Sequence, residues 1–127
     1  MEIITSKHLH TSIEQYNSLM EVLNKPKRDL VPIAVIELIK NSICGFMSAY
    51  LHENGVENID REDILALQQA CGALEPTFLE FNFESIAALM EDDNFAYSSE
   101  LGEDPLNRYL DKLNRTKDLV IRSVNRG

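Results

Sequence analysis

The longest apolar stretch of the chain, residues 31–55, predicts a helix around which the other elements are arranged. It reads VPIAVIELIKNSICGFMSAYLHENG. With an advance of about 100° per residue, its polar positions fall within an arc of roughly 80°, and apolar side chains fill the rest. This polar stripe consists of Glu37, Asn41, Gly45, Ser48 and His52. So wide an apolar surface predicts contact with two or three other helices, and Gly45 with Ala49 allows one of them to approach closely.

A first helix is predicted before this stretch, because apolar residues recur at steps of three and four. They are Leu9, Ile13, Tyr16, Met20 and Val22/Leu23. The helix begins near Ser6, or at Ser12, where Ser12 and Gln15 can form a capping box. Residues 25–29 are a short polar connection, which favours antiparallel packing of the two helices. The second helix has Pro32 in its first turn and Gly55 as its C-terminal cap.

The second half of the chain predicts two further helices and a short one. Asp60 is the expected N-cap of a third helix, whose core face is Ile64, Leu67, Cys71 and Leu74. Glu75 and Pro76 interrupt that pattern, so the chain that follows forms either a kinked continuation or a separate short helix capped near Asn82, and we expect the second. Residues 92–103 read as an acidic loop. The last helix has Asp104 as N-cap and Pro105 at its first position.

These elements predict an all-α protein, an up-and-down bundle of four long helices with one extra short helix. Residues 1–127 form a single domain, since the length suits one core and no strand pattern or repeat is visible. Glu37, Lys40 and Asn41 interrupt the longest apolar run, so no membrane span is expected. The start of the sequence lacks the pattern of a secretory signal, and a cytoplasmic protein is therefore expected.

Charge is distributed unevenly along the chain, whose net charge is −9 at pH 7. Residues 53–104 hold fourteen acids and one base, whereas residues 105–127 hold two acids and six bases. The basic last helix either packs beside an acidic neighbour or offers a strip for nucleic acid, which the overall negative charge opposes. Cys44 and Cys71 lie among apolar residues without a metal-ligand spacing, which predicts two buried free thiols. No metal or cofactor is expected.

The polar residues that carry possible chemistry gather at one end of the predicted bundle. In an antiparallel hairpin, His8 and His10 come level with the end of the second helix, where His52 lies. The start of the third helix and residues 122–126 share that end. The stripe Glu37, Asn41, Ser48 and His52 is either a solvent-facing edge or a groove between helices or protomers. Glu37 and His52 are fifteen residues apart, about 22 Å along a helix, so they cannot act on one bond.

The order of elements resembles the HEPN superfamily of small helical bundles. The residues that carry the resemblance are SICGFMSAYLHENG, the leucine- and alanine-rich helix after it, and the final helix opening at Asp104 and Pro105. The resemblance implies a four- or five-helix bundle, frequent homodimers, and roles as ribonuclease toxins, nucleotide-binding modules or partners of nucleotidyltransferases. The ribonuclease branch has an Arg followed four to six residues later by a His. No Arg of this chain has a His at that distance, so no catalytic residue is carried over.

Two functional hypotheses follow from these observations. The first is a non-catalytic helical bundle that acts as an interaction module or binds a small ligand or nucleotide. It would be a homodimer, or would pair with a protein such as a nucleotidyltransferase. The alternative is an enzyme that processes nucleic acid or nucleotides at the end that bears the histidines. The candidate ligand-binding residues are Glu37, Asn41, Ser48, His52 and Arg122.

Overall fold

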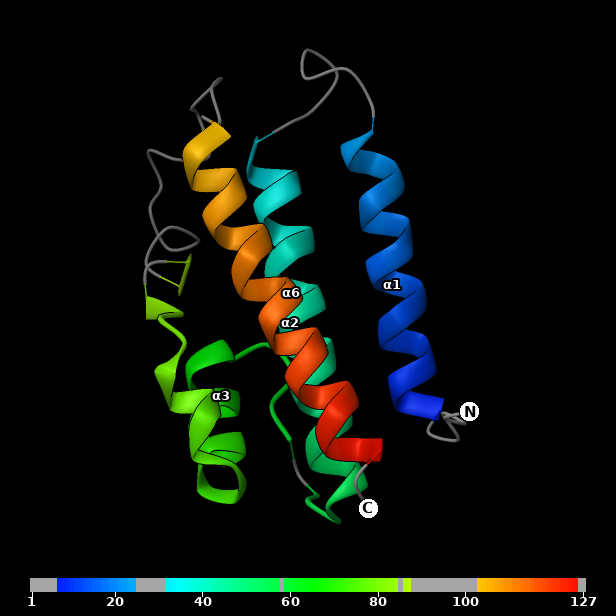
Figure 1. Ribbon diagram of the computed structural model, residues 1–127, viewed down its shortest axis with the longest axis vertical. Coiled ribbons are helices and arrows are strands. Elements are labelled where there is room, and N and C mark those ends of the chain that lie inside the picture. The colour runs from blue at the N-terminus through cyan, green and yellow to red at the C-terminus, as the bar shows by residue number, and fades with distance from the viewer. Residues whose placement is uncertain (1–6, 25–31, 58, 85, 88–102, 126–127) are drawn as a thin grey trace.

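The computed structural model describes residues 7–24, 32–57, 59–84, 86–87 and 103–125, and within these ranges it contains helices and no strands. Its elements are α1 (Lys7–Leu23), α2 (Pro32–Glu53), α3 (Ile64–Leu74), the 3₁₀ helix η2 (Pro76–Glu80) and α6 (Glu103–Asn125). The predicted all-α class is confirmed for this part of the chain. Figure 1 shows α1 antiparallel to α2, whereas α6 runs in the same direction as α2 and crosses it.

Helix α2 is the centre of the structure. It packs against α1, α6 and α3, as the width of its apolar surface predicts. Its buried residues form the middle of the core and include Val35, Ile36, Ile39, Ile43, Phe46, Met47, Tyr50 and Leu51. Leu38 belongs to the predicted apolar arc but is 41% exposed. It follows Glu37 directly and lies about one turn before Asn41, and both of these neighbours are exposed as well.

Helices α1 and α2 approach closely at Gly45, as predicted. A Cβ atom added there would lie 3.0 Å from Gln15 Oε1 and 3.3 Å from Ser12 Oγ, so a larger side chain would push α1 away. Helix α1 begins at Lys7, which agrees with a start near Ser6. The alternative capping box is wrong, because Ser12 and Gln15 lie inside the helix and Ser12 Oγ donates to the His8 carbonyl.

Helix α6 covers the opposite flank of α2 and also reaches α1. Leu113, Thr116 and Val120 are fully buried on its inner side. Tyr16 Oη donates to Asn114 Oδ1 over 2.6 Å, and Lys117 Nζ lies 4.4 Å from the centre of the Tyr16 ring. The basic helix is thus partly held by aromatic and hydrogen-bonding contacts. It begins at Glu103, one residue before the predicted cap.

The third helix differs most from the sequence-based prediction. It has 11 residues instead of forming a fourth long helix, because Glu75 caps its end and Pro76 begins η2. Its N-cap is Asp63, whose carboxylate accepts from the Ala66 N–H, and the predicted cap Asp60 instead accepts from the Glu62 N–H. Gln68 holds η2 against α3, since its Nε2 donates to the carbonyls of Phe78 and Phe81.

Three predicted features fall wholly or largely outside the described residues. These are the connection at residues 25–29, the acidic loop and most of the short helix after Asn82. Asn82 Oδ1 does accept from the Glu84 N–H, which is the contact expected of a cap. Of the described helices, one segment of α2, Ala34–Glu53, is long and apolar enough to cross a membrane, and 67% of it is buried inside the structure. The core helix of a soluble protein has the same properties.

Cys44 and Cys71 are both free and buried, as predicted. Burial raises the pKa of Cys44 to about 11, although nearby Lys40 opposes the shift. Burial also raises the pKa of Cys71 to about 12. The Cys71 thiol donates to the Met47 carbonyl. Both thiols are therefore protonated and shielded in the folded protein, which makes them poor nucleophiles.

We expect neither thiol to react with an aromatic disulfide reagent at pH 8 until the protein unfolds. Because the open population of a stable domain is small, the reaction should be slowed by roughly a thousandfold or more relative to free cysteine. Stopped-flow absorbance with increasing urea measures this rate, which should rise toward the rate of the unfolded chain. A thiol that reacts within seconds in native buffer would contradict the burial of that cysteine.

Candidate functional site

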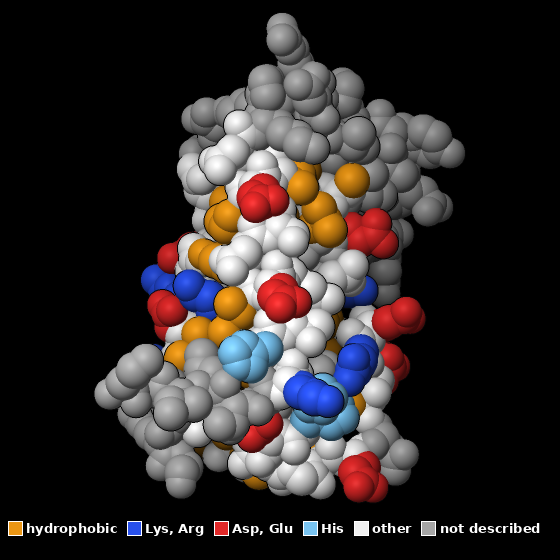
Figure 2. Space-filling view, turned by 90° about the vertical axis from the view of Figure 1, so that its right-hand side faces the viewer, with side chains coloured by type: hydrophobic (Ala, Val, Ile, Leu, Met, Phe, Trp, Pro, Cys, Tyr) orange, Lys and Arg blue, Asp and Glu red, His pale blue; other side chains and the backbone are white. Residues whose placement is uncertain are grey.

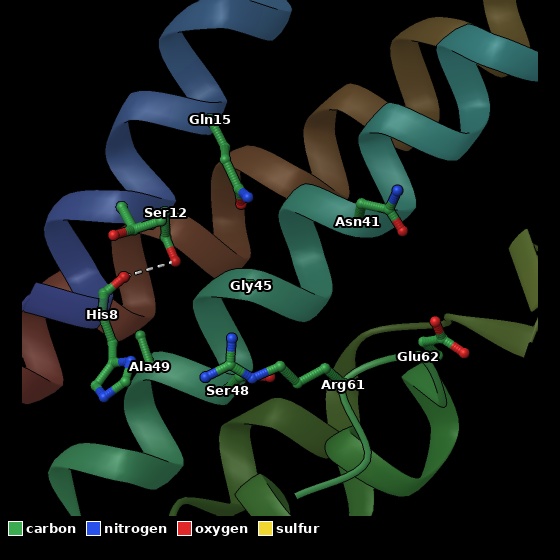
Figure 3. A pocket seen from close by; sticks show the side chains of 10 residues that line it. His8, Ser12, Gln15, Asn41, Gly45, Ser48, Ala49, Arg61 and Glu62 are labelled. Atoms are coloured by element: carbon green, nitrogen blue, oxygen red, sulfur yellow. Dashed lines mark hydrogen bonds between the residues drawn. The ribbon is translucent and has the colours of Figure 1, made fainter.

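A groove of about 420 Å³ lies between α1 and α2 beneath the loop that precedes α3. Figure 3 shows it lined from three directions. Its lining residues are His8, Thr11, Ser12 and Gln15 from α1, Asn41, Gly45, Ser48 and Ala49 from α2, and Arg61 and Glu62 from the loop. Gly45 and Ala49 form the part of its wall without long side chains. Its walls are mainly polar side chains.

Ser48 is the least satisfied polar group of this groove. The residue is only 3% exposed, and its Oγ has no hydrogen-bond partner among the described residues. Other hydroxyls within the helices do bond to their own backbone: Ser12 Oγ donates to the His8 carbonyl and Thr116 Oγ1 to the Lys112 carbonyl. A buried hydroxyl without a partner costs about 1 to 3 kcal/mol, which a bound ligand or water would offset.

His8 and His52 meet at one end of the groove, together with Arg61. The two imidazole rings are stacked with centroids 4.1 Å apart and an interplanar angle of 11°. Arg61 Nη2 lies 3.2 Å from His52 Nε2. Since a guanidinium can only donate, Nε2 is the acceptor, and the neutral His52 ring carries its proton on Nδ1. The expected meeting of His8 with the end of α2 is therefore confirmed.

The pKa of His52 is lowered from its ordinary value of 6.5. Partial burial is the largest cause, followed by the neighbouring His8 and Arg61, which both disfavour a second positive charge. The imidazole is accordingly neutral at pH 7. A neutral His52 keeps its hydrogen bond with Arg61 and holds that side chain across the end of the groove (Figure 3).

The candidate residues from the sequence divide into two groups. Asn41 and Ser48 line the groove, and His52 adjoins it through Arg61. Glu37 is exposed on α2 and does not line it. Arg122 is exposed in the last turn of α6, at the same end of the molecule (Figure 1), but its Nε donates to the Asp118 carbonyl of its own helix.

Sequence reasoning missed Arg61, Gln15 and Glu62. Arg61 did carry a signal, since it is the one base among fourteen acids in residues 53–104. Such an isolated cation stands out from a solvated acidic segment. Gln15 and Glu62 carried none, because neither residue type nor spacing separates them from ordinary surface positions.

The groove continues into a second cavity of about 400 Å³ farther along the same two helices. The cavities share Thr11, Gln15 and Asn41, and the second adds apolar side chains at Leu19, Val22 and Leu38. Figure 2, which views the α1 side, shows the His side chains in the lower part of this face, hydrophobic side chains in its upper part and at its lower left, and acidic side chains along its whole length.

The described residues contain no group of three or more His, Cys, Asp and Glu side chains arranged to hold a metal ion. Comparison of the chain with family profiles, with curated proteins and with solved structures finds no match.

We expect protein stability to fall as the pH drops below 6.5, in part because of His52. Its pKa is lower in the folded than in the unfolded state, so the unfolded chain binds more protons in this window. The loss of stability caused by His52 is absent well above pH 6.5, and it grows as the pH falls from 6.5 toward the pKa of His52 in the folded protein. Urea unfolding at pH 7.5, 6.5 and 5.5 measures it.

The variant His52→Gln is the control for this pH dependence, because its amide can still accept from Arg61 but does not titrate. The wild type should lose more unfolding free energy than the variant between pH 7.5 and 5.5. Carboxylates titrate equally in both proteins and cancel in the comparison. Equal losses of unfolding free energy in the two proteins would show that protonation of His52 does not destabilise the fold.

Proposed function

We propose that this protein is a non-catalytic helical module that binds a small polar ligand, of nucleotide size, in the groove between α1 and α2. The observation that carries the proposal is the buried, unpartnered hydroxyl of Ser48 in a groove that Arg61 crosses. The volume of about 420 Å³ lies within the range of roughly 300 to 1,000 Å³ that small-molecule pockets occupy.

The lining side chains match a ligand that has both polar edges and an anionic group. Gln15 and Asn41 present amides, each of which offers donors and an acceptor for a base or a sugar. Arg61 supplies a planar, permanently charged fork suited to phosphate or carboxylate. Glu62 provides an acceptor for amino or hydroxyl groups. This variety of donors and acceptors favours a small polar molecule over a hydrocarbon.

The proposal includes the expected assembly and partners. The order of α1, α2, α3 and α6 supports a HEPN-like up-and-down bundle in which three helices are long and the third is short. A cytoplasmic homodimer is part of the proposal, as is pairing with a protein such as a nucleotidyltransferase. Support for an interface comes from the exposed apolar side chains, which within the described chain are Leu38, Leu65, Leu74 and Leu79.

A second candidate function is an enzyme that processes nucleic acid or nucleotides at the His8–His52 end. The stacked imidazoles and the lowered pKa of His52 favour it, since a neutral imidazole at pH 7 can act as a general base. Arg61 occupies Nε2, however, so the ring must first lose that contact. Hydrolysis of RNA or nucleotides by the wild type, but not by His52→Ala, would support this function over binding alone.

For the binding proposal, we expect AMP, GMP, CMP or UMP to shift the amide resonances of Asn41, Ser48 and Arg61 in ¹⁵N-correlated spectra. Arg61→Ala should weaken binding roughly ten- to a hundredfold, since hydrogen bonds to charged groups contribute about 1.5–3 kcal/mol. Ser48→Ala should weaken it by about fivefold, from the loss of one hydrogen bond.

Arg122→Ala is the matched control, because Arg122 is an exposed arginine at the same end of the molecule but outside the groove. It should leave the affinity unchanged. If none of the four nucleotides shifts the groove resonances at millimolar concentration, the proposal is wrong. An Arg122→Ala effect as large as that of Arg61→Ala would locate the ligand on α6 instead.

For the assembly, we expect a mass of twice 14.5 kDa by size-exclusion chromatography with light scattering. Burial of exposed leucines would supply the free energy of association. A clean monomer at tens of micromolar would remove the homodimer from the proposal while leaving the groove untouched.

A further inference from the structure

The end of the groove near His8 holds three nitrogen-bearing side chains without a countercharge. His8 and His52 are stacked and Arg61 bonds to His52. Within the described chain, no ion pair joins Arg61 to a carboxylate. Glu62, the acid that lines the groove, lies on the side toward Asn41, whereas Arg61 extends toward His8 (Figure 3).

The permanent positive charge at this end of the groove belongs to Arg61. The N–H of Arg61 occupies the Nε2 lone pair of His52. Protonation of His52 would remove that acceptor and add a second charge beside the guanidinium. An anion in the groove makes protonation of His52 favourable, because its negative charge stabilises both cations. It also accepts the hydrogen bonds that Arg61 and protonated His52 then donate.

We propose that the His8, His52 and Arg61 end of the groove is an oxyanion subsite that binds the phosphate group of the ligand together with one proton. This inference rests on the proposed function and names the chemical class its ligand must contain. The proton comes from solvent and adds to Nε2 of His52, so that Arg61 is released to turn its donors toward the anion. No other bond forms or breaks.

Ser48 completes the subsite with a hydroxyl that lacks any other partner. It is buried within the same groove, and Figure 3 shows the Arg61 side chain extending past it. A phosphate oxygen at this position accepts from the guanidinium, and a small movement of the groove wall brings it within reach of the buried Ser48 Oγ. Movement of Arg61 is feasible, because the residue is exposed and lies in the loop before α3.

The other charged groups of the loop determine which way the ligand lies. Glu62 repels a phosphate and accepts from amino or hydroxyl groups, so it favours the uncharged part of the ligand at the Asn41 side. Asp60 and Asp63 are engaged with the Glu62 and Ala66 N–H groups. From α1, the titratable group that contacts the His52 ring is His8. The phosphate therefore lies at the His8 end.

Inorganic sulfate is the probe that tests proton uptake, because it stays a dianion between pH 5.5 and 7.5. Titration followed by ¹⁵N-correlated spectra should show tighter binding at pH 5.5 than at pH 7.5. Uptake of one proton permits a gain of up to about tenfold per pH unit. His52→Gln should still bind sulfate through Arg61 but lose most of this pH dependence, and Arg122→Ala should behave as the wild type.

Further titrations distinguish a nucleotide phosphate from a free anion. They also distinguish failure of the subsite from failure of the proposed function. Inorganic phosphate, AMP and adenosine are compared at pH 6.5. Tighter binding of AMP than of phosphate or adenosine supports a nucleotide phosphate at this subsite, whereas equal binding of phosphate and AMP supports a free anion. Nucleotide binding with no sulfate binding, or with sulfate affinity equally pH-dependent in the wild type and His52→Gln, overturns the subsite alone. Groove resonances that respond to sulfate but to no nucleotide overturn the proposed function alone.

The His52→Gln variant needs an independent check of its fold. Its far-UV circular dichroism and its resonances for α6 should match those of the wild type. His8→Gln provides a second variant on a different helix. If it retains the full pH dependence while His52→Gln loses it, the proton resides on His52. Full retention in both variants overturns proton uptake by the imidazole pair.

Discussion

The close approach of α1 and α2 at Gly45 is the constraint on which the functional surface depends. A Cβ atom there would meet Gln15 and Ser12 of α1 at 3.0 and 3.3 Å, so any side chain larger than glycine requires these α1 side chains to shift. That contact fixes the height at which His8 faces His52, which lies about two turns after Gly45 on α2. It also leaves the shallow space that the polar side chains line. Packing and site therefore share one cause, and a change in helix separation would alter both.

The polar stripe of α2 is not a uniform solvent-facing edge. Its exposure changes along the helix: Glu37 and Asn41 are exposed, Gly45 and His52 are half-buried, and Ser48 is buried. Because α1 runs antiparallel beside α2 (Figure 1), and His8, Ser12 and Gln15 of α1 face the second half of the stripe, the same sequence pattern serves two purposes. Toward its start the stripe contacts solvent, and toward its end it forms one wall of a groove. Helical periodicity identifies the stripe but cannot distinguish these environments.

Much of the helical architecture could be read from the sequence, because local signals are strong where they occur. The apolar width of α2, the small residues at Gly45 and Ala49, and the buried cysteines all follow from periodicity and residue size. The start of the third helix was harder to predict, because Asp60 and Asp63 lie three residues apart and are both good N-caps. Only the contact of Asp63 with Ala66 separates them. The meeting of His8 with His52 was predictable from chain direction, whereas Arg61 depends on a loop conformation that no local pattern encodes.

Arg61 also bears on whether the histidine end performs catalysis. A general base needs a free lone pair directed at the proton it removes. In this structure the Nε2 lone pair of His52 accepts from Arg61, and the other ring nitrogen carries the proton. An incoming anion that draws Arg61 away would expose Nε2, but the same negative charge favours protonation of that nitrogen. The anion that frees Nε2 of His52 from Arg61 thus also favours protonation of that nitrogen, which then acts as a hydrogen-bond donor and not as a base. This coupling favours recognition of an oxyanion over removal of a proton from it, and it explains why a histidine with a lowered pKa can belong to a binding module.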